Sequence, residues 1–279
     1  NSPASMFGHT FLFFFSGFNY RLLSFAINYQ ASADPNVENG FSFAFKGLLG
    51  MYDGRFSILP YYEKIKEYRD FENRDIWEFD LNLSYDEVVQ MYRHIWELGD
   101  AWSWYYFFDE NCSYNILWLL EVARPSLELR KKFIYQVNPP ETLFVMRDAG
   151  LITKQTYRPS RRSKLLAYEK VMSFGDVRKA KQVAKGKLAP SAIASDSTLT
   201  LDQKQYILES SIEMSEYWYA KDKLDKEEYT QIVHDSASVR SRLGASEAVD
   251  IPVPSSPLMG NRGLRVSPMY FVNTDSQNL

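Results

Sequence analysis

The stretch that decides this fold reads Tyr105-Tyr106-Phe107-Phe108-Asp109-Glu110-Asn111-Cys112-Ser113-Tyr114-Asn115, followed by Ile116-Leu117-Trp118-Leu119-Leu120. The aromatic residues before the cysteine are typical of a strand or its end, and the apolar residues after it have helical spacing. Asn111 and Ser113 are residue types that favour a helix N-cap. We therefore expect a helix that begins at or beside Cys112.

The place of Cys112 in this helix bears on its chemistry. Unpaired N–H groups and the positive end of the helix dipole favour a thiolate there. Its helical face continues through apolar residues, namely Ile116, Leu119, Leu120 and Ala123. The alternative is a small buried residue without chemistry, which is the common state of a lone cysteine. Asp109 and Glu110 also oppose a reactive thiol, because nearby carboxylates raise a thiol pKa.

Composition limits the class of protein. The 279 residues suffice for one large domain or two small ones, and 45% hydrophobic content is ordinary for a globular chain. A net charge of -3 gives no basic footprint, so we expect no nucleic-acid partner. One cysteine and three scattered histidines argue against a disulfide or a metal site, and we expect no cofactor. No apolar run approaches the ~18 residues of a membrane-spanning helix.

Strand patterns dominate the N-terminal half. Segments 5–15 and 20–29 predict a hairpin with a turn at 17–19, and segments 55–60 and 77–83 predict further strands. Residues 63–68 predict a short helix or an irregular edge. Ser84 and Glu87 form a capping box that predicts a helix start. Its buried stripe is predicted to comprise Val88, Met91, Tyr92, Ile95 and Trp96, with His94 solvated on the opposite side.

Composition changes after Thr156. Lysine and arginine recur between residues 158 and 187, which favours a solvated helical face or linker, with contact to an anionic membrane surface as the alternative. Segments 202–224 and 226–243 predict a helical pair, with His234 on its polar side. We therefore expect a thiol-enzyme domain at 1–157, a basic helical region at 158–246 and a proline-rich extended tail at 247–279. The segment 263–272 resembles the start of a strand whose partner is missing.

A nucleophilic thiol needs a base, and the base commonly needs an orienting group. His9 lies in a predicted core strand, where a polar residue requires a partner. The open end of the predicted hairpin brings Asn28 to His9, and an Asn oxygen can fix the imidazole tautomer. The order His, Asn, Cys is a circular permutation of the arrangement in papain. A core histidine bonded to a backbone carbonyl remains the alternative for His9.

Spaced blocks of this sequence resemble the Lnb-type N-terminal periplasmic domain family over roughly residues 2–155. The blocks are Ser2-Pro3-Ala4-Ser5-Met6-Phe7-Gly8-His9-Thr10-Phe11-Leu12, Asn28-Tyr29, Gly50-Met51-Tyr52-Asp53-Gly54, Pro60-Tyr61-Tyr62, Arg74-Asp75-Ile76-Trp77-Glu78 and Tyr106 to Tyr114. More distantly, Asn111-Cys112-Ser113-Tyr114 is similar to the Asn-Cys-Glu-His block of the lecithin:retinol acyltransferase group. Ser113 and Tyr114 replace the Glu and His of that block.

The resemblance implies an α+β fold: an antiparallel sheet packed by helices, with a circularly permuted papain-like core, followed by a helical C-terminal region. It implies a thiol acyltransferase or esterase in the periplasm of a Gram-negative bacterium, with attachment to the outer membrane or its β-barrel expected. Cys112 then attacks an ester, His9 is the base and later the acid, and Asn28 orients His9.

The resemblance also implies a lipid or lipoprotein substrate. Tyr106, Phe108, Asn111 and Tyr114 are the predicted substrate contacts, with core packing as the alternative for the aromatic residues. Two other functions stay open at this point. One is a cysteine peptidase or amidase acting on cell-wall peptide, and the other is a non-catalytic periplasmic module of an outer-membrane protein.

Overall fold

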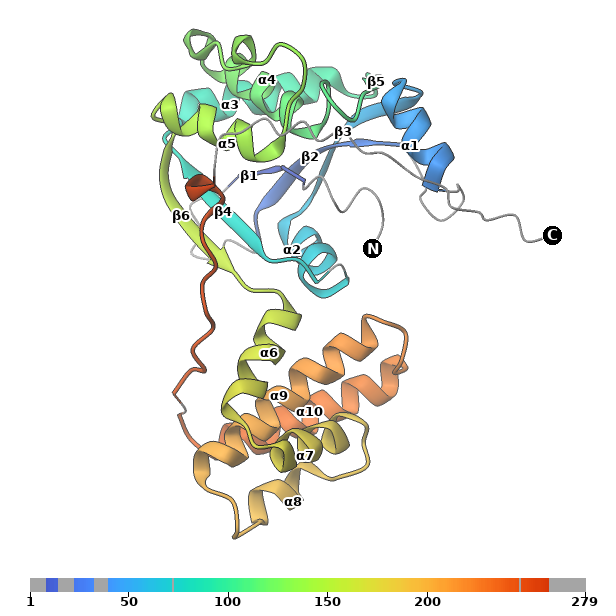
Figure 1. Cartoon of the computed structure of the whole chain (residues 1–279), viewed down its shortest axis with the longest axis vertical. Helices are drawn as coiled ribbons and strands as arrows, with labels where there is room; N and C mark the ends of the chain where they lie inside the picture. The colour runs from blue at the N-terminus through green and yellow to red at the C-terminus, as the bar shows by residue number, and fades with distance from the viewer. Residues whose placement is uncertain (1–8, 15–22, 33–39, 72, 246, 261–279) are drawn as a thin grey trace, which may run out of the picture.

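A computed structural model of the chain describes residues 9–14, 23–32, 40–71, 73–245 and 247–260. Within these residues, a sheet of four antiparallel strands lies at the centre of the N-terminal part (Figure 1). Its order is β1 (Leu12–Phe14), β2 (Phe25–Ala31), β3 (Tyr52–Pro60) and β5 (Ser103–Tyr105). The predicted α+β class with an antiparallel sheet and helices is confirmed.

The predicted pairing of the first two strands is present. β1 and β2 run antiparallel with Leu12 opposite Ile27 and Phe14 opposite Phe25. The predicted turn at 17–19 lies outside the described residues. By this register His9, three residues before Leu12, lies beside the end of β2 that carries Asn28 and Gln30.

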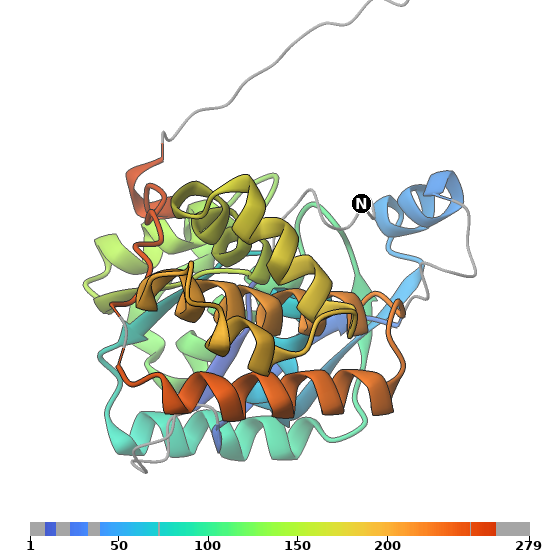
Figure 2. The same cartoon turned by 90° about the horizontal axis from the view of Figure 1, so that it is seen from below.

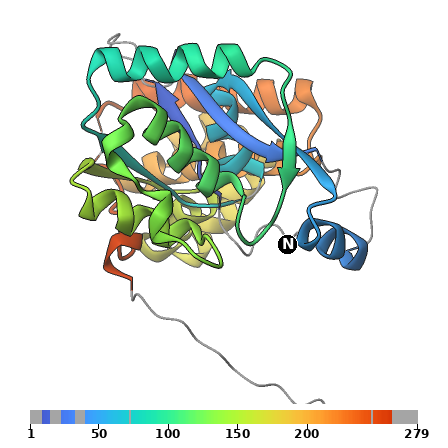
Figure 3. The same ribbon diagram turned by 90° about the horizontal axis from the view of Figure 1, so that it is seen from above.

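The two faces of β2 face different cores because successive strand residues point to opposite sides. Ile27 belongs to the main cluster with the helices α3 (Tyr85–Leu98), α4 (Cys112–Ala123) and α5 (Pro139–Asp148). Ala26 packs instead with Tyr61 of α2 (Tyr61–Ile65). In Figures 1 and 3, α3, α4 and α5 lie on one side of the sheet, with α2 on the other. The sheet is therefore covered on both faces where it carries the predicted site.

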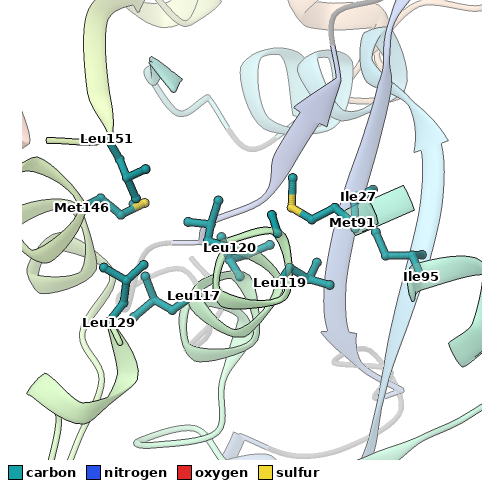
Figure 4. Close-up of a cluster of buried hydrophobic side chains, with 11 residues drawn as sticks. Ile27, Met91, Ile95, Leu117, Leu119, Leu120, Leu129, Met146 and Leu151 are labelled. Carbon is teal, nitrogen blue, oxygen red and sulfur yellow. The ribbon is translucent and has the colours of Figure 1, made fainter. Parts of the chain in front are cut away.

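Helix α4 is the centre of the main core, as its sequence predicts. It extends over Cys112–Ala123, and its predicted buried face is buried throughout. Figure 4 shows its leucines between two groups of side chains. One group is Leu129, Met146 and Leu151, and the other is Ile27, Met91 and Ile95.

Helix α3 forms with the predicted capping box between Ser84 and Glu87. Its predicted stripe is partly wrong: Met91 and Ile95 are buried, but Tyr92 and Trp96 are 42% and 78% exposed. The prediction of a solvated His94 is also wrong. Its ring lies edge-on to Trp118 at 4.9 Å, and its Nε2 is buried without a hydrogen-bond partner. The face of α3 that packs against α4 therefore includes His94.

A second, two-stranded sheet joins β4 (Ile76–Leu81) to β6 (Ile152–Arg158). The alternating pattern of residues 77–83 correctly predicts a strand, but the most buried positions of β4 include Glu78. Its carboxylate accepts hydrogen bonds from Tyr61 and Arg158, which stabilise a charge that burial alone would penalise.

The predicted short helix near residues 63–68 is present as α2 and the π-helix η3 (Lys66–Phe71), which follows it directly. Helix α1 (Gly40–Leu48) precedes β3, and the short helices η4 (Pro125–Leu127) and η5 (Arg130–Lys132) connect α4 to α5. No described helix is long and apolar enough to cross a membrane.

The C-terminal helices pack beside one another (Figure 2). They have a hydrophobic cluster of their own. They are α6 (Arg161–Val171), α7 (Phe174–Ala184), α8 (Pro190–Ser195), α9 (Leu201–Tyr219) and α10 (Lys226–Arg242). The pair α9 and α10 corresponds to the predicted helical pair, and His234 is exposed as predicted. The basic segment is helical. Arg161 within it is buried and ion-paired with Glu213, so this arginine is not part of a solvated face.

The proline-rich segment is extended, as predicted, but it returns to the N-terminal part (Figure 1). Its short helix η6 (Pro257–Met259) contacts α5. Ser256 donates a hydrogen bond to Gln155 at 2.7 Å, and Arg147 donates one to the Leu258 carbonyl at 3.2 Å. The predicted strand at 263–272 lies outside the described residues.

Gly54 provides a test of this architecture. A Cβ at Gly54 would overlap the phenol oxygen of Tyr29, which hydrogen-bonds to Ser103 at 2.7 Å. We expect Gly54→Ala to lower the free energy of unfolding by about 1–3 kcal/mol, measured by urea denaturation. The control is Gly175→Ala in α7, whose Cβ would stand 3.6 Å from Ser173 Oγ. Gly175→Ala should change the free energy of unfolding by no more than about 1 kcal/mol. Equal losses of stability in both variants would contradict the close approach of Tyr29 to Gly54.

Candidate functional site

The start of α4 is held by Asn111, which is its N-cap. The Asn111 side-chain oxygen accepts hydrogen bonds from the N–H groups of Ser113 at 3.0 Å and Tyr114 at 3.2 Å. Its amide nitrogen donates to the carbonyls of Phe107 at 3.1 Å and Val137 at 2.7 Å. Both ends of this amide are thus bonded within the protein. These bonds fix the helix start, and the substrate contact of Asn111 stays a prediction.

Cys112 is the first residue of α4 and is 4% exposed. Burial raises the pKa of its thiol, because it disfavours the charged form. The charge and hydrogen bond of His9 oppose this, together with bonds from the Thr10 N–H and the Tyr105 hydroxyl. The result is a thiol pKa lowered from 9.0 to about 7. Asp109 and Glu110 are exposed and are not among the groups that dominate this pKa.

His9 responds to Cys112 in the complementary direction. Burial lowers the pKa of the imidazole, but the charge and hydrogen bond of Cys112 and a bond to Asn28 raise it above 6.5 overall. The thiolate and the imidazolium therefore stabilise each other. A lowered thiol pKa beside a raised imidazole pKa is a condition that an activated cysteine nucleophile and its base have to meet.

Asn28 orients the imidazole. It is fully buried in β2, and its Oδ1 lies 2.5 Å from His9 Nε2, which donates to it. Its Nδ2 donates in turn to Gln30 Oε1 at 2.6 Å. Gln30 stands two residues along the same strand, so it fixes which end of the Asn28 amide faces His9. Because Nε2 is bonded to Asn28, we infer that Nδ1 is the ring nitrogen left for the hydrogen bond with the thiol.

An aromatic and cationic wall supports His9 from the side of α2 and η3. The rings of His9 and Tyr68 stack at 5.8 Å, and Phe11 stacks on Tyr68 at the same separation. Lys64 is buried, lies 5.7 Å above the Tyr68 ring and is paired with Glu67 at 2.6 Å. Its charge opposes the protonation of His9. The sequence offers only an i,i+3 Lys–Glu pair as a signal for this neighbour of the site.

Tyr105 is the site residue whose contact with Cys112 the sequence analysis missed. Its hydroxyl accepts a hydrogen bond from the Cys112 N–H at 3.1 Å, and it also contacts the thiol. Burial raises its own pKa well above 10.0, and the charge of Cys112 adds to this, so the phenol stays protonated. Tyr105 therefore places an O–H group beside the backbone N–H at the start of α4.

The other predicted substrate residues lie around the start of α4. Tyr106 packs against Gly50, where any Cβ would overlap its ring. Phe108 is about half exposed. Tyr114 is partly buried, with the Arg130 guanidinium 5.4 Å from the centre of its ring. Among the described residues, no cluster of His, Cys, Asp and Glu is arranged to hold a metal ion.

Comparison with known families divides the chain into two matched regions. The model of the Lnb N-terminal periplasmic domain matches residues 1–146, and a domain of unknown function (DUF7842) matches residues 155–252. The chain has no significant match among curated proteins or among solved structures. The first match contains the cysteine, the histidine and the asparagine of the site.

The pKa of the lone thiol tests the pairing with His9. In His9→Gln the burial of the thiol is no longer opposed by a cation, so we expect its pKa to rise from about 7 to at least the ordinary 9.0. The thiolate absorbance at 240 nm, taken against Cys112→Ala at each pH, measures this titration. His234→Gln changes an exposed histidine and should leave the pKa unchanged. A thiol that still titrates near 7 without His9 would contradict the ion pair.

Proposed function

The chain belongs to the Lnb N-terminal periplasmic domain family, and from that premise we propose that it is a thiol-dependent acyltransferase or esterase. The family is one of periplasmic domains, so the chain is a periplasmic module. One observation carries the proposal: Cys112 pairs with His9, whose Nε2 is in turn bonded to Asn28. A thiol with a pKa of about 7 beside an oriented imidazole has the properties of an acyl-accepting nucleophile.

In the first step, the Cys112 thiolate attacks the carbonyl carbon of an acyl ester. The tetrahedral oxyanion forms and collapses, the carbon–oxygen bond to the alcohol breaks, and the acyl group stays on sulfur as a thioester. The His9 imidazolium gives its proton to the departing alkoxide and becomes neutral. Asn28 keeps Nδ1 directed to this reaction because it holds Nε2.

In the second step, a hydroxyl, an amine or water attacks the thioester carbonyl. Neutral His9 takes the proton of the attacking group, and the thiolate leaves. The acyl group is thereby transferred or hydrolysed, and the ion pair of Cys112 and His9 is restored.

The oxyanion formed in both steps needs donors near the start of α4. The Cys112 N–H is one, and at present it donates to the Tyr105 hydroxyl at 3.1 Å. Substrate replaces this internal bond, after which the protonated phenol can donate to the same oxyanion. Tyr105 is thus proposed as a second donor.

Apolar surface beside the site supports a lipid-like acyl group. Tyr105 belongs to an aromatic cluster with Phe43, Tyr52 and Phe107. The ring centres of Phe43 and Phe107 lie 5.3 Å apart, which joins α1 to the segment that follows β5. Large apolar side chains are exposed on and around these two elements: Phe41, Phe45, Leu48, Leu49, Trp102, Trp104 and Phe108. An exposed apolar patch of this kind marks a site of contact with a hydrophobic ligand or surface.

Covalent acylation tests the proposed reaction. The full chain is mixed with the p-nitrophenyl ester of a long-chain fatty acid, quenched in acid and measured by intact mass spectrometry. We expect one acyl group, bound at Cys112 and removed by hydroxylamine. Cys112→Ser should give no thioester, and His9→Gln should acylate about 10²–10⁴ times more slowly. The rate should fall as the pH drops below about 7, because the thiol then takes up a proton.

The controls separate this function from its alternatives. His234→Gln should acylate like the unmodified chain, because the residue is exposed and far along the sequence in α10. An adduct that persists in Cys112→Ala would place the chemistry elsewhere. Faster cleavage of peptide amides than of acyl esters would indicate an amidase, and no turnover of either would leave a non-catalytic module.

The Tyr105 hydroxyl can be tested separately. Tyr105→Phe keeps the ring and its stacking on Tyr29 but removes the O–H donor. We expect acylation to slow about 10²-fold, as for other lost oxyanion donors, with a small rise in the thiol pKa. Stopped-flow release of p-nitrophenol measures the rate. A faster reaction in Tyr105→Phe would mean that the hydroxyl only obstructs the Cys112 N–H.

A further inference from the structure

The helical segment formed by α2 and η3 has two functional faces. Tyr61, Lys64 and Tyr68 lie on the face that is buried toward the sheet and His9. Tyr62, Lys66 and Arg69 lie on the other face. This second face lines a cavity of about 400 Å³, whose remaining wall comes from the end of β6 and from α6. We call it the cationic cavity; its lining residues are Tyr62, Ile65, Lys66, Arg69, Tyr157, Arg158, Pro159 and Lys164.

Among the residues that the structure describes, the lining of the cationic cavity contains four cationic side chains, those of Lys66, Arg69, Arg158 and Lys164, and no carboxylate. Two of the cations come from the η3 wall, and two come from the β6 and α6 wall. Like charges on facing walls repel one another, so an anion between them would be stabilised by all four.

Carboxylates outside the lining hold Arg158 and Lys164 in position. Arg158 directs its Nε and Nη2 to Glu78, and Lys164 Nζ lies 2.6 Å from Glu213 Oε1. A guanidinium has five N–H donors in all, so two bonds to Glu78 do not exhaust it. The carboxylates therefore reduce the positive charge of the wall but also preorganise it. Lys66 and Arg69 bring two cationic side chains to the opposite wall.

We propose that the cationic cavity binds a phosphate-bearing ligand. A phosphate group presents several anionic oxygens in three dimensions, which suits cations on two facing walls, and arginine is well suited to bind phosphate oxygens in pairs. Tyr62 and Tyr157 add hydroxyl groups and ring surface for the group that the phosphate carries. The volume is in the range of sites that hold small organic ligands.

The cationic cavity lies between the two matched regions of the chain. Residues 62–69 belong to the region that matches the Lnb N-terminal periplasmic domain, and residues 157–164 belong to the region that matches DUF7842. A phosphate ligand would thus contact both. This binding site does not depend on the proposed acyl transfer, because its residues lie on the opposite face of α2 and η3 from His9.

The test uses the full chain and two sources of phosphate. Inorganic phosphate and glycerol 3-phosphate are titrated by isothermal calorimetry at low salt. Vesicles of phosphatidylcholine, with and without phosphatidylglycerol, are tested by co-sedimentation. The cavity variant is Lys66→Gln with Arg69→Gln. Its matched control is Lys181→Gln with Lys187→Gln, which removes two exposed lysines outside the cavity lining.

We expect the cavity variant to bind at least about tenfold more weakly, since each lost charged hydrogen bond contributes about that factor, and the control to bind unchanged. Binding of the soluble phosphates would identify a soluble ligand, and binding of phosphatidylglycerol vesicles alone would identify a lipid headgroup. Either kind of binding supports the site if the cavity variant loses it. Absence of binding, or equal losses in both variants, would overturn it. Lys66→Glu, at an exposed position, replaces the double variant if that variant fails to fold.

Discussion

The site depends on one interaction, the contact between the buried thiol of Cys112 and the buried imidazole of His9. Burial by itself raises the pKa of the thiol and lowers the pKa of the imidazole, so each group alone would be neutral. When the two groups lie together, the pKa of the thiol is lowered and the pKa of the imidazole is raised. The surrounding structure serves this pair: Asn111 fixes where α4 begins, and Asn28 fixes the imidazole from inside β2. The low dielectric that penalises each charge alone also strengthens their attraction.

Much of the pair's surroundings follows from local sequence. The boundaries and buried face of α4 depend on a cap, an apolar period of 3.6 and Pro125 after its end, all of which are readable along the chain. The meeting of His9 and Asn28 follows from hairpin topology, because the register of β1 and β2 brings their ends together. The catalytic roles of these residues remain proposals.

The predictions from sequence fail for residues whose contacts come from another segment of the chain. The period of α3 cannot show that Trp118 of α4 partly covers His94 while Trp96 stays exposed. Glu78 and Arg161 look like surface charges in sequence, yet Arg158 and Glu213 make their burial tolerable. Tyr105 precedes Cys112 by seven residues, but its contact requires the chain to turn between β5 and α4. Periodicity reports the faces of an element and not the groups that other elements bring to them.

The π-helix η3 shows why the two sites can share one segment. A π-helical turn shifts the phase of side chains relative to an α-helix, and such turns are frequent at functional sites. Here Tyr68 stacks against His9, while Arg69, the next residue, lines the cationic cavity. The N-terminal end of the segment is anchored because Tyr61 donates a hydrogen bond to Glu78, which also holds Arg158. Arg158 itself lines the cavity. The same buried carboxylate thus positions the helix that supports His9 and one of the cations available to a phosphate.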